Sequence, residues 1–346
     1  MAFSDWISTV VSSAPLCILT LLTLGVIFVN GWTDAPNAIA SCVATRALSP
    51  RVAVGMAAVF NFLGLITTVT VHRTVTDTVY SMVDFGEDEN ACHVALCAAM
   101  AAIVLWAIAA WYFGIPTSES HALMAGISGA ALAIGGEEGI RFSAWSRVFT
   151  GLGISVLMGF CLGWVCVRVI LILAKGCERK GTQKTLRALQ ILAGAANAFL
   201  HGAQDGQKFI GVLLLSVATT AGEQAPDKIP IWMILLCSAA LSVGTGLGGN
   251  RIIRAVGMKM LKLTDVQGVA ADAAAAISLW FCTLRGLPVS TTHVKTTAIM
   301  GAGAATRLRA VNWSVARQMV LAWCLTFPGC GILGYLAARL GLLLTA

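Results

Sequence analysis

The sequence has 346 residues, of which 58% are hydrophobic and only 11% are charged, and its net charge is +7 at neutral pH. The mean hydropathy of +0.83 excludes an ordinary soluble domain, because a domain of this size would need far more polar surface. Long apolar runs separated by short charged loops indicate an all-α polytopic membrane protein. The basic residues lie at the ends of these runs, as in loops that face the cytoplasm, which argues against a nucleic-acid partner.

In chain order, the apolar runs predict six membrane spans and two helical hairpins. The first run begins near Pro15 without a basic segment before it, so we expect a retained span rather than a cleaved signal peptide. The second arm of the first hairpin, residues 121–134, is too short to cross ~30 Å of hydrocarbon at about 1.5 Å per residue, which predicts re-entrant hairpins. The first and fourth spans are expected to be broken helices. The spans cover residues 14–44, 52–71, 148–173, 188–218, 231–249 and 318–344, and the hairpins cover 93–134 and 265–305.

Two motifs recur at nearly one offset. NGWTDAPNAI (Asn30–Ile39) matches HGAQDGQKFI (His201–Ile210), which gives an offset of 205 − 34 = 171 between their aspartates. GIPTSESHALMAG (Gly114–Gly126) matches the start of GLPVSTTHVKTTAIMGAG (Gly286–Gly303), with an offset of 286 − 114 = 172. A shared offset of about half the chain predicts a tandem duplication. Residues 1–174 and 188–346 form the two repeats, and the basic segment 175–187 links them.

Loop charges predict that the two repeats cross the membrane in opposite senses. The loop Arg46–Arg51 is basic, whereas its counterpart Glu223–Lys228 is mostly acidic. The next loop, Asp77–Glu89, is acidic, and its counterpart Arg251–Lys262 is basic. Because basic loops stay in the cytoplasm, the repeats should be inverted and both termini should be external. Inverted repeats are typical of transporters whose substrate site lies at the bilayer midplane.

The tips of the two hairpins are expected to bind an anion. Each tip has a Gly-x-Pro break followed by hydroxyl residues, so backbone N–H groups are left unpaired at the positive end of a helix dipole. Hydroxyls and amides in this arrangement suit an oxyanion. His121 and His293 occupy equivalent positions of the two tips, and both a packing role and a ligand role are open for them.

Five charged residues lie within or beside the apolar runs. A charge near the bilayer centre costs at least a few kcal/mol, so such residues are usually paired and functional. Asp34 and Asp205 are equivalent in the repeat and lie beside the helix breaks, where a carboxylate and nearby carbonyls suit sodium or a proton. A buried ion pair that locks the repeats together is the structural alternative. The five residues are Asp34, Glu119, Asp205, Lys208 and Lys295.

Other motifs carry less information. GTGLGG (Gly244–Gly249) fits a nucleotide-binding pattern, but no strand precedes it, so close helix packing explains it better. GISG (Gly126–Gly129) resembles the nucleophile loop of intramembrane serine proteases, with Ser128 as the nucleophile, but an enzyme would leave the duplicated motifs unexplained. The eleven cysteines form no CxxC pair and show no zinc spacing. We expect neither an enzyme nor a resident cofactor.

Together, the two aspartate motifs and the two hairpin tips resemble the inorganic phosphate transporter (PiT) family, and a short bacterial-type member in particular. The resemblance implies that hairpin hydroxyls and amides hold the anion and that the signature aspartates handle coupling cations and substrate. Carried over to this sequence, the substrate-binding residues are Asn37, Thr117, Ser118, Glu119, Ser120, Lys208, Ser290, Thr291 and Thr292. The cation or proton residues are Asp34, Glu119, Gln204 and Asp205, with Asp34 and Asp205 as metal ligands if sodium is the ion.

The sequence departs from the family pattern at several positions. Thr33 and Gln204 stand where many members have Asn, and Lys208 stands where sodium-coupled members have Asn. A fixed ammonium at Lys208 would replace a bound sodium. Glu119 stands where a hydroxyl is usual and is expected to be protonated or paired with Lys208 or Lys295. Hydrogen phosphate can donate a hydrogen bond to such a carboxylate, whereas sulfate cannot.

The resemblance and the residues together predict a secondary active transporter that imports phosphate with a proton or sodium by alternating access, in the cell membrane. Some short family members carry sulfate, so a sulfate permease of the same fold stays open. An anion channel and an intramembrane serine hydrolase are the alternatives from other classes. Faces rich in Gly and Ala are compatible with a homodimer but do not require one.

Overall fold

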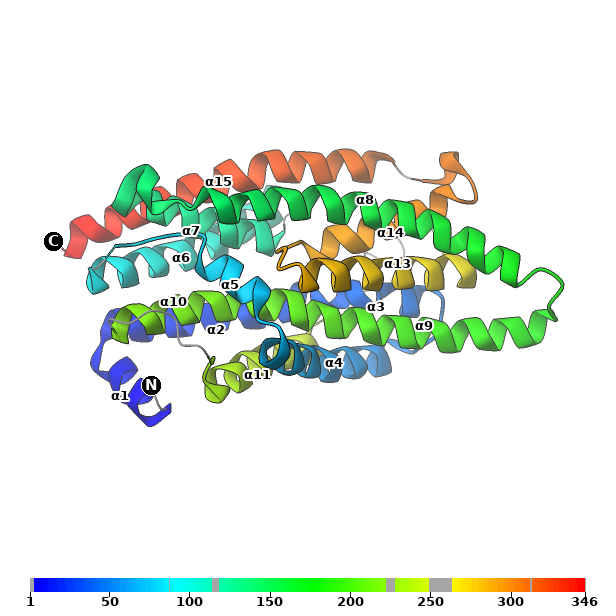
Figure 1. Ribbon diagram of the computed structural model, residues 1–346, viewed down its shortest axis with the longest axis horizontal. Coiled ribbons are helices and arrows are strands. Elements are labelled where there is room, and N and C mark those ends of the chain that lie inside the picture. Colours follow the sequence, from blue (N-terminus) through cyan, green and yellow to red (C-terminus); the bar gives the residue numbers. More distant parts are fainter. Residues whose placement is uncertain are drawn as a thin grey trace.

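The computed structural model describes residues 3–86, 88–113, 118–221, 228–248, 263–311 and 313–345. These parts of the chain are helical except for turns and one bridge between Val83 and Ile140. Most helices lie along the long axis of the molecule (Figure 1). Both termini lie toward one end, which we call the terminal end, and the Ala174–Glu178 turn lies at the other, which we call the linker end.

In the part of the chain that the structure describes, both halves consist of successive helices. The first half contains α1 (Phe3–Ser12), α2 (Ala14–Thr33), α3 (Ala35–Ala44), α4 (Pro50–Val71), α5 (Thr74–Tyr80), α6 (Glu89–Phe113), α7 (Glu119–Gly135), η1 (Gly136–Gly139) and α8 (Phe142–Leu173). The second half contains α9 (Arg179–His201), η2 (Gly202–Gly206), α10 (Gln207–Ala221), α11 (Ile231–Leu247), α13 (Asp265–Leu284), α14 (Thr291–Ala304), η3 (Leu308–Ala310) and α15 (Trp313–Thr345).

Among the described residues, six helical segments are long and apolar enough to cross a membrane, which confirms the expected multi-pass character. They are Ala14–Ala44, Pro50–Val71, Glu89–Ala109, Phe142–Leu173, Asp265–Leu284 and Ala316–Thr345. Four coincide with predicted spans, and two are the first arms of the predicted hairpins. The predicted span 231–249 corresponds to α11, a shorter apolar helix with 17 described residues. The helix α9 begins at Arg179, so much of the segment expected to be a linker is helical.

Both predicted helix breaks are present, and the first has a local cause, a proline. The helix α2 ends at Thr33, with Asp34 as its C-cap, and Pro36 lies in the first turn of α3, where its missing N–H cannot continue the hydrogen bonding of α2. In the second half the break is a π-helical segment, Gly202–Gly206, between α9 and α10. Such widened turns interrupt the regular hydrogen bonding of a helix and often mark functional sites. Asp34 and Asp205 both lie at these breaks.

Helices from opposite halves pack on one another around the centre. The hairpin α6–α7 packs on α15, and the hairpin α13–α14 packs on α8. The helices α8 and α15 run in opposite directions along the long axis (Figure 1). Small residues allow close approach at these contacts: a Cβ atom at Gly129 would overlap the carbonyl of Gly331, and one at Gly301 would overlap that of Phe160.

Two helices lie outside the sequence predictions. The helix α1 folds back at the terminal end, where Trp6 is buried and its ring stacks on Trp232 at 5.7 Å between centroids. The helix α5 overlaps the start of the acidic loop expected from Asp77 onward. It packs against α10, and the backbone N–H of Thr76 donates to Gln207 Oε1 at 3.2 Å.

Candidate functional site

The two hairpin tips meet in the centre of the molecule. Ser118 caps α7 and Ser290 caps α14, and each hydroxyl oxygen accepts the backbone N–H of the histidine three residues later at 3.4 Å. The histidines themselves, His121 and His293, lie side by side with ring centroids 5.1 Å apart. The positive ends of two helix dipoles therefore point into one small region.

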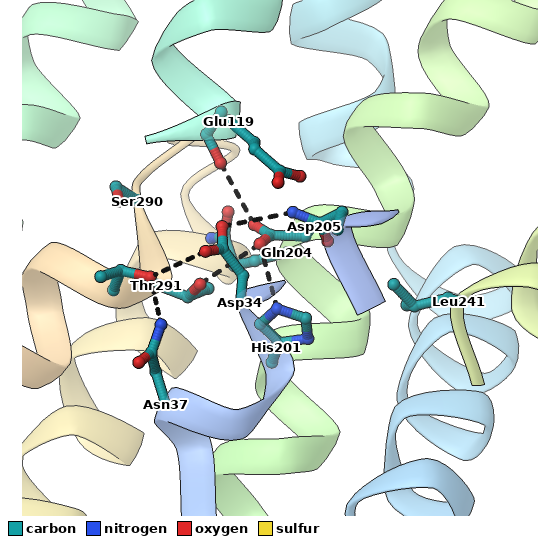
Figure 2. Close-up of polar contacts among 12 residues, drawn as sticks. Asp34, Asn37, Glu119, His201, Gln204, Asp205, Leu241, Ser290 and Thr291 are labelled. Carbon is teal, nitrogen blue, oxygen red and sulfur yellow. Dashed lines mark hydrogen bonds and ion pairs between the residues drawn. The ribbon is translucent and has the colours of Figure 1, made fainter. Parts of the chain in front are cut away.

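The carboxylate of Asp205 lies between the tips and contacts both of them. Ser120 of the first tip donates to Oδ1 at 3.4 Å, and Thr291 of the second tip donates to Oδ2 at 3.2 Å. His201, one turn earlier on α9, places Nε2 at 3.2 Å from Oδ2. Figure 2 shows Glu119, Asp205 and Thr291 around Asp34, with His201 beside them.

The ammonium of Lys208 occupies a site made of three oxygens. It lies 2.6 Å from Asp205 Oδ1, 2.7 Å from the Ser120 hydroxyl and 2.5 Å from the carbonyl oxygen of Val289. The side chain is fully buried. A buried ammonium requires such a set of acceptors, because desolvation of an unpaired charge is very costly.

The second aspartate, Asp34, belongs to a smaller hydrogen-bonded group. Asn30 donates to Oδ2 at 3.3 Å, and Thr292 of the second tip donates to Oδ1 at 3.4 Å. Asn37 in turn donates to the Thr292 hydroxyl at 2.9 Å. Both halves of the chain therefore contribute donors to each aspartate.

The carboxylate of Glu119 is buried without an ionic partner among the described residues. Its Oε1 accepts a hydrogen bond from Thr33 at 2.6 Å, and its Oε2 accepts none from the residues that the structure describes. Of the two states expected for Glu119, a pair with Lys208 or Lys295 is not formed, because Lys208 pairs with Asp205 and Lys295 pairs with Asp272. A protonated Glu119 stays a prediction. An open acceptor therefore remains on Glu119 beside the tips.

A cavity of about 10 Å³, measured to the centre of a water-sized sphere, adjoins this group of residues. Its walls include Asp34, Asn37, His201, Thr291 and Lys295. This volume is about enough for one water molecule. The polar side chains of the site therefore pack closely and form hydrogen bonds and ion pairs with one another.

Comparison with known proteins then assigns the family. The sequence matches the Phosphate transporter family over residues 30–334. The chain belongs to this family. A relative from Bacillus subtilis (strain 168), described as a "Probable low-affinity inorganic phosphate transporter", is 37% identical over 93% of this chain and 97% of that protein. A relative of the same description from Rhizobium meliloti (strain 1021) is 35% identical over 90% of this chain and 93% of that protein.

A solved structure titled "The sodium-dependent phosphate transporter" shares the fold. It superimposes with a TM-score of 0.86 over 96% of this chain and 100% of that chain, at 21% identity. The resemblance of the sequence motifs to the inorganic phosphate transporter family is thus confirmed. The relatives are described as transporters and not as enzymes.

Most of the predicted site residues of this family member lie together at the two tips, with two exceptions. Gln204 points to the segment before the second tip, where it donates to Thr283 at 3.0 Å and to the Leu287 carbonyl at 3.2 Å. Its contacts position that segment rather than the carboxylates. Thr117 lies outside the described residues.

Three residues at or near the site were not singled out from the sequence as site residues. Asn30 and His201 are equivalent in the repeat, and that equivalence was a usable signal. Asp272 lies in the run AADAAAA, where an acidic residue among alanines was a second usable signal. Ser128, considered as a nucleophile, accepts a hydrogen bond from the indole of Trp145 at 3.0 Å.

Proposed function

We propose that this phosphate transporter family member imports inorganic phosphate in symport with a cation, by alternating access of a central site. The observation that carries the proposal is the convergence of hydroxyls from both tips on one buried carboxylate, that of Asp205. Hydroxyl donors at the amino ends of two helices suit a tetrahedral oxyanion. Here those donors are engaged by carboxylates of the protein.

Competition for the same donors gives a physical basis for coupling. While Asp34 and Asp205 are ionised, they hold the hydroxyls of Thr292, Ser120 and Thr291 and repel an incoming anion. A proton or cation that neutralises these carboxylates weakens both effects. The hydroxyls can then turn to phosphate, so anion and cation bind together. Coupled binding is what a symporter requires.

Inverted repeats with re-entrant hairpins are part of the same proposal. Its support is that a close glycine contact occurs once in each half, at equivalent positions. Gly129 lies against the carbonyl of Gly331, and Gly301 lies against the carbonyl of Phe160. Gly129 is equivalent to Gly301 and Phe160 is equivalent to Gly331, since 129 + 172 = 301 and 160 + 171 = 331. Equivalent helices such as α8 and α15 also run in opposite directions (Figure 1). If the long axis lies along the membrane normal, the halves are inverted and the tips lie near the midplane.

We propose the proton rather than sodium as the coupling ion. Sodium in membrane transporters is coordinated by oxygens, including backbone carbonyls at helix breaks. In this chain Lys208 fills a site of that kind, made of a carboxylate, a hydroxyl and a carbonyl. A tethered ammonium supplies the positive charge permanently, which leaves no need for sodium there.

The open acceptor on Glu119 favours phosphate over sulfate as the substrate. Phosphate at neutral pH keeps at least one proton and can donate to Oε2, whereas sulfate has no proton to give. With Glu119 ionised, sulfate would leave two negative groups in contact without a hydrogen bond between them. The descriptions of the relatives also name phosphate.

Uptake into proteoliposomes tests this function. With labelled phosphate, an inward proton gradient should drive accumulation, sodium alone should not, and excess sulfate should leave uptake nearly unchanged. Uptake that follows only the phosphate gradient would instead identify a channel. A complete block by low sulfate would identify a sulfate permease. Normal uptake by Ser128→Ala together with lost uptake by Thr291→Ala would exclude the hydrolase.

The membrane orientation has its own test. We propose that the protein lies in the cell membrane with both termini external and with the Ala174–Glu178 turn in the cytoplasm. Cys177 in this turn is exposed. A membrane-impermeant maleimide should label it in inverted vesicles and not in intact cells. Labelling of Cys177 in intact cells would reverse the orientation.

A further inference from the structure

A second buried ion pair lies near the hairpin tips and has no role in the coupling described above. Lys295 lies on α14 one turn beyond Thr291, toward the linker end, and pairs with Asp272 of α13. Its Nζ atom also lies 3.3 Å from the carbonyl oxygen of Ala38. Both side chains are almost completely buried. A pair of this kind is expensive to bury, and an apolar pair is often as stable.

The other half of the chain shows that the fold does not need charges at this position. By the repeat offset, Lys295 corresponds to Leu123 and Asp272 corresponds to Met100 (295 − 172 = 123 and 272 − 172 = 100). Leu123 and Met100 are fully buried in one apolar cluster at the terminal end of the site. The same architecture is therefore closed by hydrophobic packing on one side of the tips and by an ion pair on the other.

Asp272 remains well satisfied without the lysine. Its carboxylate accepts a hydrogen bond from Ser41 at 2.5 Å and another from the amide of Gln190, and the Cys42 thiol lies 3.8 Å from Oδ2. These donors come from α3 and α9. Departure of the ammonium would leave the carboxylate solvated by protein groups, so Lys295 can exchange partners at a modest cost.

Lys295 also opens onto the central site. It lines the same cavity as Asp34, Asn37 and Thr291. Asn197 completes that wall, and its buried Oδ1 accepts no hydrogen bond from the described residues. A protonated phosphate offers an anionic oxygen that can replace Asp272 beside the ammonium, and an O–H for the amide oxygen of Asn197, which lacks a donor among the described residues.

We propose that Lys295 and Asn197 form a second oxyanion subsite on the linker side, which takes phosphate from the tips by exchanging Asp272 for the anion. The inference rests on the proposed transport function and adds a step to it. The pathway is then asymmetric: an apolar seal closes the terminal side, and an ion pair that phosphate can replace closes the linker side.

The test copies the apolar residues of one half into the other. In Asp272→Met/Lys295→Leu the charges are removed together, so no unpaired charge remains, and the variant should fold and bind phosphate at the tips. In vesicles of uniform orientation, the KM for phosphate entering from the terminal side should stay within about twofold, because the tips are intact. Maximal uptake should fall by about tenfold or more, and the KM for phosphate leaving from the linker side should rise by about the same factor. This factor is the effect of losing one hydrogen bond to a charged group.

Two further variants decide the outcome. Asp272→Asn/Lys295→Gln also removes both charges, and its side chains are closer in shape to the native ones. It serves if the apolar variant does not fold, and it should likewise leave the KM from the terminal side unchanged and raise the KM from the linker side. Met100→Leu/Leu123→Met, in the other half, should transport like the wild type. If either neutral pair transports normally in both directions, the pair is structural only and the subsite is rejected. If the wild type itself takes up no phosphate, the proposed function fails instead.

Discussion

Ser120 and Thr291, which come from opposite halves of the chain, donate hydrogen bonds to the two oxygens of one carboxylate, that of Asp205. Each residue lies in the first turn of a hairpin helix whose amino end points to the centre. Movement of either hairpin would therefore change the same carboxylate. The carboxylate of Asp205 therefore connects the positions of the two hairpin tips.

Removal of the Thr291 hydroxyl should impair transport without unfolding the protein. Thr291→Val keeps the shape of the side chain and deletes the donor to Asp205. A hydrogen bond to a charged group contributes about 1.5–3 kcal/mol, so phosphate uptake should fall by about 10- to 100-fold. Thr297→Val on the same helix is the matched control, because that hydroxyl donates to carbonyls of its own helix, at 3.0 Å. Equal losses in both variants would contradict the role of the tip.

The meeting of the tips was predictable because it depends on a repeat that the sequence displays. The equivalent registers of Ser118 and Ser290 predicted two capped helices, and both caps are present. The partner of each charge was not predictable in the same way. Lys208 and Asp205 are three residues apart and pair locally, but Lys295 pairs with Asp272 across the hairpin. Periodicity gives no information on which of several buried acids a lysine will reach.

Replacement of glycine by alanine should lower the stability of the protein where helices are in close contact and should not lower it at exposed positions. A Cβ atom at Gly301 of α14 would overlap the Phe160 carbonyl of α8, so Gly301→Ala should destabilise the protein by about 1–3 kcal/mol. Gly153 lies on α8 where an added Cβ atom would meet no neighbouring segment within 4 Å, and Gly153→Ala should be neutral or stabilising by up to about 1 kcal/mol. Thermal unfolding in detergent measures both. A tolerated Gly301→Ala would show that the contact between α8 and α14 is loose.

The ion pair at the terminal end should give a pH-dependent contribution to stability. The backbone N–H of Gly86 and then the guanidinium of Arg141 hold the pKa of Asp84 below its usual value. A lowered pKa means that the stabilisation is present above the unfolded-state pKa of about 3.9 and is lost as the pH falls through the folded-state value. Because both side chains are partly exposed, Asp84→Asn should cost less than about 1 kcal/mol.

The measurement compares the unfolding temperature of Asp84→Asn with that of the wild type across pH. The difference should be nearly constant from pH 7 down to about pH 5, should shrink as the pH falls past the unfolded-state pKa of about 3.9, and should vanish below the lowered folded-state pKa, where Asp84 is protonated in both states. A difference that persists in acid would mean that the loop contacts, and not the charge, hold this bridge between Val83 and Ile140.

Replacement of Lys208 should change the ion that drives transport. Lys208→Asn removes the ammonium and leaves the oxygens of Asp205, Ser120 and Val289 around the position that it occupied, with an amide oxygen added. Carbonyl, hydroxyl and carboxylate oxygens are ligands for sodium. Phosphate uptake by this variant should therefore rise with external sodium, whereas wild-type uptake should not respond.

Stability supplies a second readout for the same variant. Loss of one partner of a buried ion pair costs about 3–5 kcal/mol, so Lys208→Asn should unfold at a lower temperature and recover as sodium is added. Lys208→Met is the matched control, because it deletes the same charge but supplies no oxygen, and it should recover less. If both variants keep the proton dependence of the wild type and ignore sodium, then the ammonium is a structural counter-ion of Asp205, and the choice of coupling ion is made elsewhere in the chain.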